Sequence, residues 1–517
     1  MKMARTSSTG SYGFLLLFSC LLTLVSGSMW FKRSSTPVIP PPVAGKESCS
    51  EVAMSMLKDL DRRIKGSVTI VQGTEVNNLT WSKPTPVPLA VVRPANEDDV
   101  SIAVPILADL KRIHGIDFRV KSGGHHYNAY SSVKNGIVLD LGRLNSFSLD
   151  EKRGDNRRTA WIGPAVSGGA VWSELVRQRG TGVIMGGCPA VNQGGFILGG
   201  GFSYWSRLYG LGCDRLRQAR VVLADGTTVI ANSTNEHKDL FWALRGAGSA
   251  GVGGVVTAFQ VDTFETQDQQ VYGLGLIETV DETARFMSKM NDATLPGNVG
   301  MSLFLFPKKY FGPDFVSLYN WYDTGIDNLH AGMETLNSTF HQMLSEVTAN
   351  RFGLEMKSAT EQSKNGLMDG RLWQVWNGFL MPEKCTPAII AKLLSLLKEM
   401  RDLGDEYVTV EILLWGGAIS KVDSKNSAFY WRRGRFNVCV NLGVPAHIVG
   451  SKEIFERQRA ILNKAWRRAE RYMEGCYFNY PMREASLEDY FGRNVGRLRR
   501  VKKIYDPDNV FSHPQSF

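Results

Sequence analysis

Several common signatures are absent from this chain of 517 residues. No two cysteines are spaced as Cys-x-x-Cys, so we predict no zinc site and no other metal. No Rossmann fingerprint is present, because the glycine spacing and the ribose-binding acid are both wrong. No internal repeat is apparent, and beyond the N-terminal region no run of about eighteen apolar residues occurs. We therefore expect a soluble globular protein whose phosphate-binding loops, if any, are of another kind.

The net charge of +10 raises the question of nucleic-acid binding. The lysines and arginines are scattered among apolar stretches, and no nucleic-acid-binding motif is present. The densest basic run, 497–503, has Leu498, Val501 and Tyr505 at helical spacing. This run predicts an amphipathic helix with a solvated basic face, and we expect no nucleic-acid partner.

Residues 1–27 have the features of a secretory signal peptide. Lys2 and Arg5 precede an apolar run over 14–25, and small residues follow it. An uncleaved anchor is the alternative, although the run is short for a membrane span. Six cysteines lie beyond this segment, and the sequence alone does not pair them. We expect a secreted N-glycosylated protein without a membrane anchor after cleavage, with sequons at Asn78, Asn232 and Asn337.

Glycine content and hydrophobic periodicity divide the rest of the chain. Residues 28–50 resemble an unstructured leader, 51–266 show a glycine-rich α/β pattern, and 267–475 show strands and helices typical of an antiparallel α+β domain. Residues 476–517 form a separate C-terminal segment. Helices are expected from the Asn96 cap to Gly115 and from the Thr386 cap to Gly404. Strands are expected at 118–121, 137–141, 301–306, 316–322, 407–415 and 436–441.

Two glycine-rich segments could bind a phosphate group. Residues 121–127 read Lys-Ser-Gly-Gly-His-His-Tyr and follow a predicted strand, so the turn would present unobstructed backbone N–H groups. The second segment has seven glycines among the sixteen residues 186–201. That many glycines cost conformational entropy unless a ligand or another backbone must approach closely. A set of tight turns is the alternative interpretation.

Four motifs follow one another in an order typical of one enzyme family. They are the 121–127 turn, Gly-Cys-Pro at 187–189, Asp-Leu-Phe-Trp-Ala-Leu-Arg-Gly at 239–246 and Tyr-Phe-Asn-Tyr at 477–480, and Asp-Pro-Asp-Asn at 506–509 comes last. In these motifs the chain resembles the berberine-bridge-enzyme-like FAD oxidases of the vanillyl-alcohol-oxidase superfamily. The resemblance implies a two-domain α+β fold. A PCMH-type FAD-binding domain (51–266) and an antiparallel substrate-binding domain (267–475) would precede a segment (476–517) that returns to the FAD domain.

The resemblance also implies covalently bound FAD. His125 matches the histidine that attaches to the flavin 8α-methyl group, and Cys188 matches the cysteine that bonds to flavin C6. Both are nucleophiles on turns, which suits such bonds. His126 competes for the first bond, but the family pattern places the attachment directly after the second glycine. The other predicted cofactor-binding residues are Ser122, Gly123, Gly124, Gly187, Val191, Gly194, Gly195, Gly200, Val255 and Asn479.

Two residues are candidates for catalysis. Tyr480 matches a catalytic tyrosine of the family, and hydride can leave a carbinol carbon only as the hydroxyl proton is removed by a base. Glu411 lies on a strand where the family places residues that contact substrate, although a solvent-facing glutamate is an open alternative. Pro481-Met482-Arg483 departs from the family pattern, so the surroundings of the base stay open. Val191 matches a position where a small side chain leaves room for O2, which favours an oxidase.

These features predict a secreted, monomeric FAD-dependent oxidase that transfers hydride from an alcohol to the flavin and electrons to O2, giving H2O2. The substrate would be a small molecule, either a sugar or a specialised metabolite. Trp321, Tyr322 and Trp415 would stack on a sugar or else belong to the core. Alternatives are a dehydrogenase, an oxidative cyclisation enzyme, or an inactive flavin-binding protein. The combined presence of His125, Cys188 and Tyr480 argues against the last.

Overall fold

The computed structural model describes most of the chain beyond the predicted signal peptide. Within the described residues, no helix is long and apolar enough to cross a membrane. The predicted signal peptide, the sequons at Asn78 and Asn337, and Tyr322 lie outside these residues. The described residues are 47–71, 85–150, 158–203, 205–248, 251–265, 270–273, 277–292, 295, 297, 299–307, 315–321, 350–353 and 370–517.

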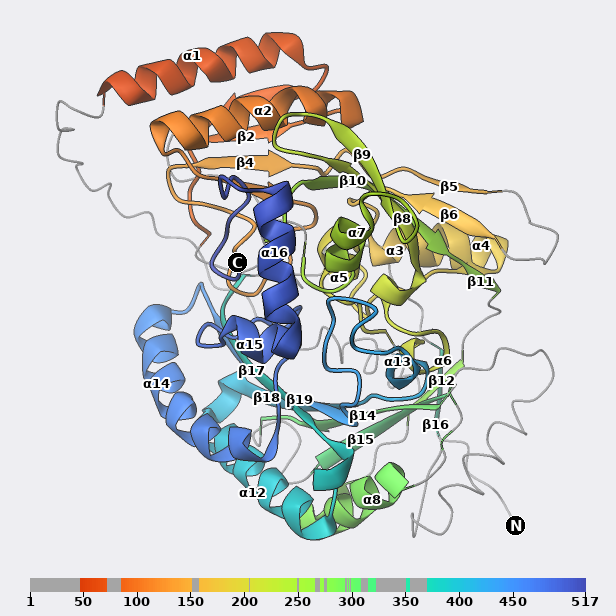
Figure 1. Ribbon diagram of the computed structural model, residues 1–517. Coiled ribbons are helices and arrows are strands. Elements are labelled where there is room, and N and C mark those ends of the chain that lie inside the picture. Colours follow the sequence, from red (N-terminus) through yellow and green to blue (C-terminus); the bar gives the residue numbers. More distant parts are fainter. Residues whose placement is uncertain are drawn as a thin grey trace, which may run out of the picture.

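A four-stranded mixed sheet with the order β1-β2-β4-β3 forms the top of the molecule in Figure 1. β4 is parallel to both β2 and β3, and two helices pack on the sheet. The predicted helix after Asn96 is confirmed: the Asn96 side chain accepts a hydrogen bond from the Asp99 N–H group, and Gly115 ends the helix in a left-handed conformation. The elements are α1 (Glu47–Arg63), β1 (Ser67–Ile70), β2 (Ala90–Arg93), α2 (Glu97–His114), β3 (Phe118–Lys121) and β4 (Ile137–Asp140).

A five-stranded antiparallel sheet with the order β5-β6-β10-β8-β9 follows beside the first. Its strands are β5 (Phe147–Leu149), β6 (Thr159–Ile162), β8 (Leu216–Val222), β9 (Thr228–Asn232) and β10 (Val255–Asp262). The glycine-rich region between β6 and β8 folds into short elements packed on this sheet. These and the neighbouring elements are α3 (Gly168–Ala170), η2 (Val171–Val176), α4 (Arg177–Arg179), β7 (Thr181–Gly182), α5 (Gln193–Leu198), α6 (Ser206–Tyr209), η3 (Gly212–Arg215), α7 (Lys238–Leu244) and β11 (Phe264–Glu265).

A six-stranded antiparallel sheet with the order β13-β15-β14-β18-β19-β17 forms the lower half of Figure 1. Helices α8, α12 and α14 cover one face and bury a hydrophobic core against it. The predicted helix after Thr386 is confirmed, and β19 extends four residues beyond the predicted strand end at 441. The elements are β12 (Gln270–Gly273), β13 (Ile277–Glu278), α8 (Val280–Asp292), β14 (Val299–Leu305), β15 (Phe315–Trp321), β16 (Asn350–Gly353), β17 (Arg371–Leu380), η4 (Pro382–Lys384), α12 (Pro387–Leu403), η5 (Asp405–Tyr407), β18 (Val408–Leu414), α13 (Ala418–Lys421), β19 (Phe436–Pro445), α14 (Ser451–Ala469) and η6 (Glu470–Tyr472).

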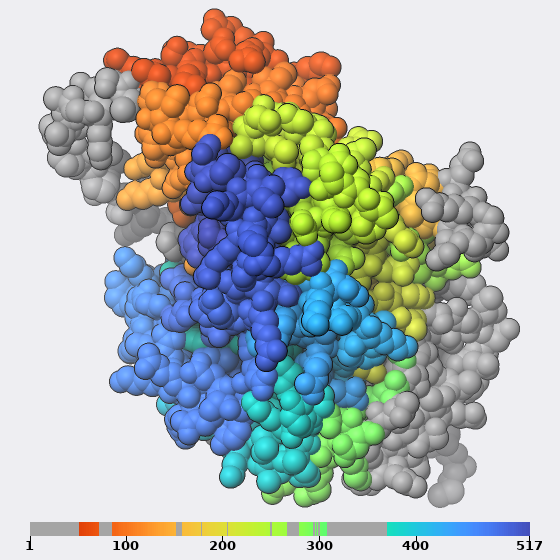
Figure 2. Space-filling view, in the orientation of Figure 1, coloured from red at the N-terminus to blue at the C-terminus, as the bar shows by residue number. Residues whose placement is uncertain are grey.

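The C-terminal segment leaves the lower half and returns to the upper half. It contains α15 (Leu487–Phe491), η7 (Gly492–Asn494) and α16 (Val495–Tyr505). α16 packs on α7, and the last residues, dark blue in Figure 2, lie against the orange N-terminal part. The predicted two-domain α+β fold is therefore confirmed, whereas the boundaries at 266 and 475 stay predictions.

A buried aromatic cluster joins the two halves. Trp415 at the end of β18 stacks on Phe202 and Phe429, with ring centroids 4.6 and 5.8 Å apart. Tyr477 of the C-terminal segment meets the same Trp415 ring edge-on at 5.4 Å. Trp415 is fully buried, so it belongs to the core and has no face left for a sugar. The Trp321 side chain, the other candidate on a described strand, lies outside the described side chains.

Candidate functional site

The turn that carries the predicted attachment histidine is fixed where it leaves β3. At the end of β3, Lys121 Nζ donates a hydrogen bond of 3.1 Å to Asp140 Oδ1, and this pair is buried. The next residue, Ser122, donates from Oγ to the Pro164 carbonyl oxygen at 2.6 Å. Gly124 has φ of +74°, where a side chain would be strained. The sequence therefore presents His125 from a turn that only glycine allows.

The two adjacent histidines have different surroundings. The Asn128 N–H group donates to His126 Nδ1 at 3.2 Å, so in the neutral ring the proton resides on Nε2, which lies 2.9 Å from Gln515 Oε1. Burial lowers the pKa of both His125 and His126 to about 4, so both are neutral near pH 7. Since both ring nitrogens of His126 bind protein groups, His125 is the better candidate for attachment.

The second glycine segment packs directly against this turn. The Gly194 N–H group donates to the Pro164 carbonyl oxygen at 2.8 Å, the same oxygen that Ser122 binds. A Cβ atom on Gly123 would lie 2.9 Å from Asn192 Cγ, and one on Gly194 would lie 2.9 Å from Ser122 Cβ. Glycine is needed at both positions because the two segments touch. The structure thus brings the turn with His125 and the loop with Cys188 together.

These loops fit a large planar cofactor with a pyrophosphate. His125 and Cys188 are each half-buried as whole residues, and the Nε2 atom of His125 is itself buried. Gly195 is exposed, and a Cβ atom there would meet nothing within 4 Å. Gln193 is 1 % exposed, and its Oε1 accepts no hydrogen bond from any described residue. Bare backbone, two nucleophilic side chains and a spare buried acceptor are what FAD would require here.

The Tyr-Phe-Asn-Tyr motif anchors the C-terminal segment on the loop after α5. The N–H groups of Gly201 and Phe202 donate to the Tyr477 hydroxyl at 3.1 and 2.8 Å. Asn479 Nδ2 donates to the Phe196 carbonyl oxygen at 3.0 Å, and a Cβ atom on Gly199 would collide with Asn479 Oδ1 at 1.9 Å. Tyr477 and Asn479 therefore hold the two halves together, which brings Tyr480 towards the loops.

Glu411 lies on the sheet face opposite α8, α12 and α14. The strand register pairs Glu411 of β18 with Cys439 of β19 and with Phe304 of β14, and pairs Cys439 with Asn377 of β17. Directly opposite residues share a face, so the four side chains form one row across the sheet. Burial raises the pKa of Glu411 from 4.5 to about 7. A carboxyl group with this pKa can take up or release a proton near neutral pH.

Tyr480 lies beside Glu411. Burial raises the pKa of Tyr480 well above 10, and the Glu411 carboxylate raises it further. The Tyr480 ring meets Tyr127 edge-on at 6.2 Å, and Asn377 Nδ2 donates to the Tyr480 carbonyl oxygen at 2.6 Å. Tyr127 is two residues beyond His125. The structure therefore places the two candidate bases beside each other and next to the histidine turn.

The other predicted cofactor-binding residues lie partly on the glycine loops and partly in the hydrophobic core. The Val191 N–H group donates to the Cys188 carbonyl oxygen at 3.1 Å, so Val191 closes the Cys188 turn. Gly187 is half-buried beside Cys188, and Gly200 is buried with φ of +118°. Val255 is fully buried in the core of the first sheet, so its side chain is used for packing, and a contact with adenosine stays a prediction. Among the described residues, no group of three His, Cys, Asp or Glu side chains could hold a metal ion.

Sequence reasoning missed several residues of the site. Tyr127 was named only as part of the glycine turn, and Gln193 was not singled out at all. Asn377 lies on a strand that no motif marked, yet it also accepts a hydrogen bond of 2.7 Å from the Tyr477 N–H group. Only the position of Tyr127, two residues after the attachment histidine, could have pointed to it.

Comparison with known proteins agrees with this geometry. Residues 88–232 match the family described as "FAD binding domain", and residues 476–517 match "Berberine and berberine like". The chain is 25 % identical over 508 residues to Berberine bridge enzyme-like 9 of Arabidopsis thaliana, covering 88 % of each chain. It is 26 % identical over 457 residues to a chitooligosaccharide oxidase of Gibberella zeae, covering 83 % of this chain and 87 % of that one. The solved structure of Physcomitrella patens BBE-like 1 has a TM-score of 0.73 at 20 % identity, over 89 % of this chain and 98 % of that one.

The fold and the paired glycine loops define an FAD-linked oxidoreductase with the PCMH-type architecture. Both family matches and the similarity over 88 % of the chain make it similar to the berberine-bridge-enzyme-like FAD-linked oxidases of that superfamily. The predicted resemblance, the fold class and the FAD cofactor are confirmed.

Proposed function

We propose that the protein is a secreted oxidase that removes hydride from an alcohol carbon of a small molecule and passes the electrons to O2, giving H2O2. The observation that carries this proposal is the position of Tyr480, between the Glu411 carboxyl group and the turn that bears His125. When bound, FAD accepts the hydride and returns two electrons to the acceptor. The protein has to bind the substrate, orient it and remove its hydroxyl proton.

The two acidic groups divide the proton transfer between them. A phenol with a raised pKa is protonated at neutral pH, so Tyr480 can accept the substrate proton only if it loses its own. Glu411, with a pKa of about 7, is partly ionised at that pH, and its charge acts on Tyr480, so we assign it as the group that receives the proton. Tyr480 thus takes the proton from the substrate hydroxyl and passes its phenolic proton to Glu411.

Two covalent links to FAD are part of the proposal. His125 would bond to the flavin 8α-methyl group and Cys188 to C6, from turns that contact each other through Gly123 and Asn192. The neutral state of His125 supports this role, because a protonated imidazole is not a nucleophile. Two links would also withdraw electron density from the flavin, which suits oxidation of poorly activated alcohols.

The proposal of O2 as acceptor rests on Val191, which closes the Cys188 turn. A screen of sugars and aromatic alcohols that follows H2O2 release would identify the substrate class. Rapid mixing of reduced protein with O2 then tests the acceptor. Val191→Leu should slow reoxidation, and Val191→Ala, which adds no bulk, should not. If the wild type is reoxidised as slowly as a typical dehydrogenase, the protein is a dehydrogenase or a cyclisation enzyme, and the oxidase proposal fails.

The named activities of the relatives leave the substrate open between two kinds. The Gibberella zeae relative is named a chitooligosaccharide oxidase, and another, from Berberis wilsoniae, is named a tetrahydroberberine oxidase. A sugar or an alkaloid-like alcohol is therefore the proposed substrate, and a monomer the proposed state. An inactive flavin-binding protein is the second candidate, and any turnover in the screen would exclude it.

A further inference from the structure

Asn377 of β17 binds both ends of the turn that carries Tyr480. The turn is closed by its own backbone, because the Tyr480 N–H group donates to the Tyr477 carbonyl oxygen at 3.0 Å. Asn377 Oδ1 accepts a hydrogen bond from the Tyr477 N–H group at 2.7 Å, and Asn377 Nδ2 donates one to the Tyr480 carbonyl oxygen at 2.6 Å. One side-chain amide therefore binds the two backbone groups of these tyrosines that the turn itself does not use.

The surroundings of Asn377 set the direction of its amide. Asn377 is 1 % exposed, and Asn437 of β19 is fully buried beside it. Asn437 Nδ2 faces Asn377 Oδ1 at 3.4 Å and the Gly378 carbonyl oxygen at 3.3 Å. Two donors, from Tyr477 and Asn437, thus point at Asn377 Oδ1, which leaves Nδ2 to face the Tyr480 carbonyl oxygen. A reversed amide would set donor against donor and acceptor against acceptor.

The strand register puts Asn377 in the row of side chains that contains Glu411. Asn377 is directly opposite Cys439 on β19, and Cys439 is directly opposite Glu411 on β18. Two strand spacings, about 10 Å, therefore separate the backbones of Asn377 and Glu411. The residue that holds the Tyr480 turn and the proposed proton acceptor lie on the same face of one rigid sheet.

The chain that leads to Tyr480 lies along the edge of this sheet. β17 ends the strand order, and Phe379 exchanges two backbone hydrogen bonds with Glu474, at 3.0 and 2.9 Å. Asn377 is the next residue of β17 whose backbone N–H group faces this edge, and that group lies 3.3 Å from Met482 Sδ. At this position the side chain of Asn377 continues the contact that the backbone makes at Phe379.

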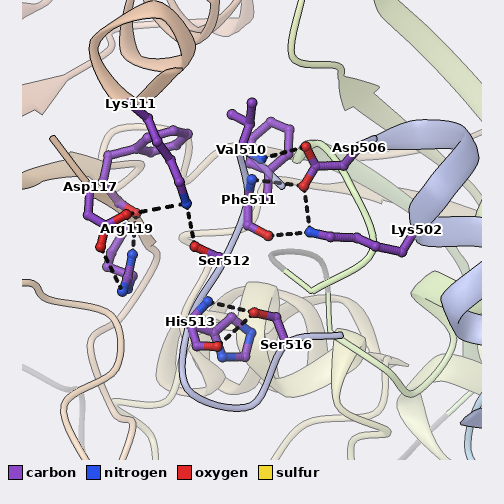
Figure 3. A network of polar contacts seen from close by, with 11 residues as sticks. Lys111, Asp117, Arg119, Lys502, Asp506, Val510, Phe511, Ser512, His513 and Ser516 are labelled. Atoms are coloured by element: carbon purple, nitrogen blue, oxygen red, sulfur yellow. Dashed lines mark hydrogen bonds and ion pairs between the residues drawn. The ribbon is translucent and has the colours of Figure 1, made fainter. Parts of the chain in front are cut away.

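The end of the C-terminal segment has a separate anchor on the other half of the molecule. Asp506 accepts hydrogen bonds from the N–H groups of Val510 and Phe511 at 2.7 and 2.9 Å (Figure 3). Helices α15 and α16 lie between this network and Tyr480 in the chain. The network therefore fixes the chain end against the first sheet, whereas Asn377 fixes the Tyr480 turn against the substrate-binding sheet.

We propose that Asn377 is a positioning residue that holds the Tyr480 phenol over the row of side chains that contains Glu411. It acts through the backbone of Tyr480, since its amide binds the carbonyl oxygen of that residue. A displacement of about 1 Å at a reacting group can lower a rate by about 10²-fold, so a fixed backbone matters here. The effect on the reaction rests on the proposed function, whereas the placement of the Tyr480 ring does not.

The first test needs no substrate and uses the holoprotein labelled with 3-fluorotyrosine. The fluorine resonance that is missing from Tyr480→Phe belongs to the Tyr480 ring. It should shift or broaden in Asn377→Leu, which has a similar volume but no amide, and stay unchanged in Asn494→Leu. Asn494 is the matched control, because its amide donates to the carbonyl oxygens of Ser427 and Ala428 at 3.2 and 3.3 Å. Those bonds also join the C-terminal segment to the substrate-binding half, but at η7.

The second test measures anaerobic flavin reduction with the alcohol that the screen of sugars and aromatic alcohols identifies. Asn377→Leu should lower the limiting rate about 10- to 100-fold and change the half-saturating concentration little. In the Tyr480→Phe background the same substitution should have no further effect, because a positioning residue acts only through the group it positions. A merely structural residue would lower the rate equally in both backgrounds.

Asn377→Ser replaces Asn377→Leu if the latter folds poorly, because water can then reach the two backbone groups that lose the amide. If the Tyr480 resonance in these variants matches the wild type, or if Asn494→Leu shifts it equally, the positioning role is wrong. A moved resonance with an unchanged rate also overturns that role when Tyr480→Phe is slow. If Tyr480→Phe is itself as fast as the wild type, the proposed base fails, and the resonance alone decides whether Asn377 places the ring.

Discussion

At the residue scale, Glu411 and Tyr480 are the two residues proposed to take part in removing the substrate proton. We expect Tyr480→Phe to slow flavin reduction by about 10²- to 10⁴-fold, the usual contribution of a general base, while FAD stays attached. Glu411→Gln should slow it by a similar factor, because Tyr480 can take the substrate proton only by passing its own to Glu411. Anaerobic stopped-flow reduction measures both, once a substrate is known. If the flavin of Tyr480→Phe is reduced at the wild-type rate while Glu411→Gln is nearly inactive, then Glu411 and not Tyr480 is the base.

The raised pKa of Glu411 also makes stability depend on pH. The pKa of Glu411 is 4.5 in the unfolded protein and about 7 in the folded one. The unfolded state therefore releases this proton more readily, and the free energy of unfolding of the wild type falls as pH rises from 4.5 towards 7. Glu411→Gln should therefore be equally stable below pH 4.5 and gain up to about 3 kcal/mol over the wild type at pH 8. Denaturant unfolding at several pH values checks this. An advantage that is the same at pH 4 and pH 8 would contradict the assigned pKa.

His125 and Cys188 can be tested separately for attachment. Each lies on its own turn, so His125→Ala and Cys188→Ala should each keep FAD bound after acid precipitation, and the double variant should release it. Mass spectrometry of the wild type should find flavin on the peptide at His125 and not on His126, whose nitrogens both bind protein groups. Free FAD released from the wild type would rule out both bonds.

At the scale of elements, the turn after α16 depends on one buried carboxylate. Asp506 is 2 % exposed and binds Lys502, which is 6 % exposed, as well as two backbone N–H groups. Asp506→Asn keeps much of the shape but leaves the buried lysine without its counter-charge, which typically costs about 3–5 kcal/mol. Thermal and denaturant unfolding measure the loss. The exposed pair of Arg112 and Asp508 is the comparison, and Asp508→Asn should cost no more than about 1 kcal/mol.

Elements with local signals were predictable, and those set by distant partners were not. Asn96, Gly115, Thr386 and Gly404 mark helix ends because caps act over a single turn. β19 continues to Pro445 because ten successive residues pair with β17, which no local pattern reveals. The positions of His125 and Cys188 on the two touching glycine segments were predictable from motifs, whereas their attachment to FAD stays a prediction. The contact of Gln515 with His126, across 389 positions, was not.

At the scale of the whole molecule, four cysteines bear on the expected secretion. Cys213, Cys385, Cys439 and Cys476 are buried and form no disulfide with any other described cysteine.

Secretion stays a prediction of the N-terminal sequence. Expression in a eukaryotic secretory host should give protein in the medium that lacks residues 1–27 and shrinks on glycosidase treatment. Asn232 is the sequon to map first, because Ser233 and Thr234 beside it are exposed. Retention of an intact N-terminus inside the cell would contradict this prediction.

The return of residues 506–517 to the first sheet has a consequence for the order of folding during synthesis. Phe511 packs edge-on against Phe118 at 5.7 Å, so the strand before the histidine turn is completed by residues that the ribosome makes only after the whole six-stranded sheet. A nascent chain that has emerged only as far as β10 has the glycine loops but neither Phe511 nor Gln515. The cofactor-binding half should therefore mature only once residues 506–517 have emerged, and flavin attachment should follow that step.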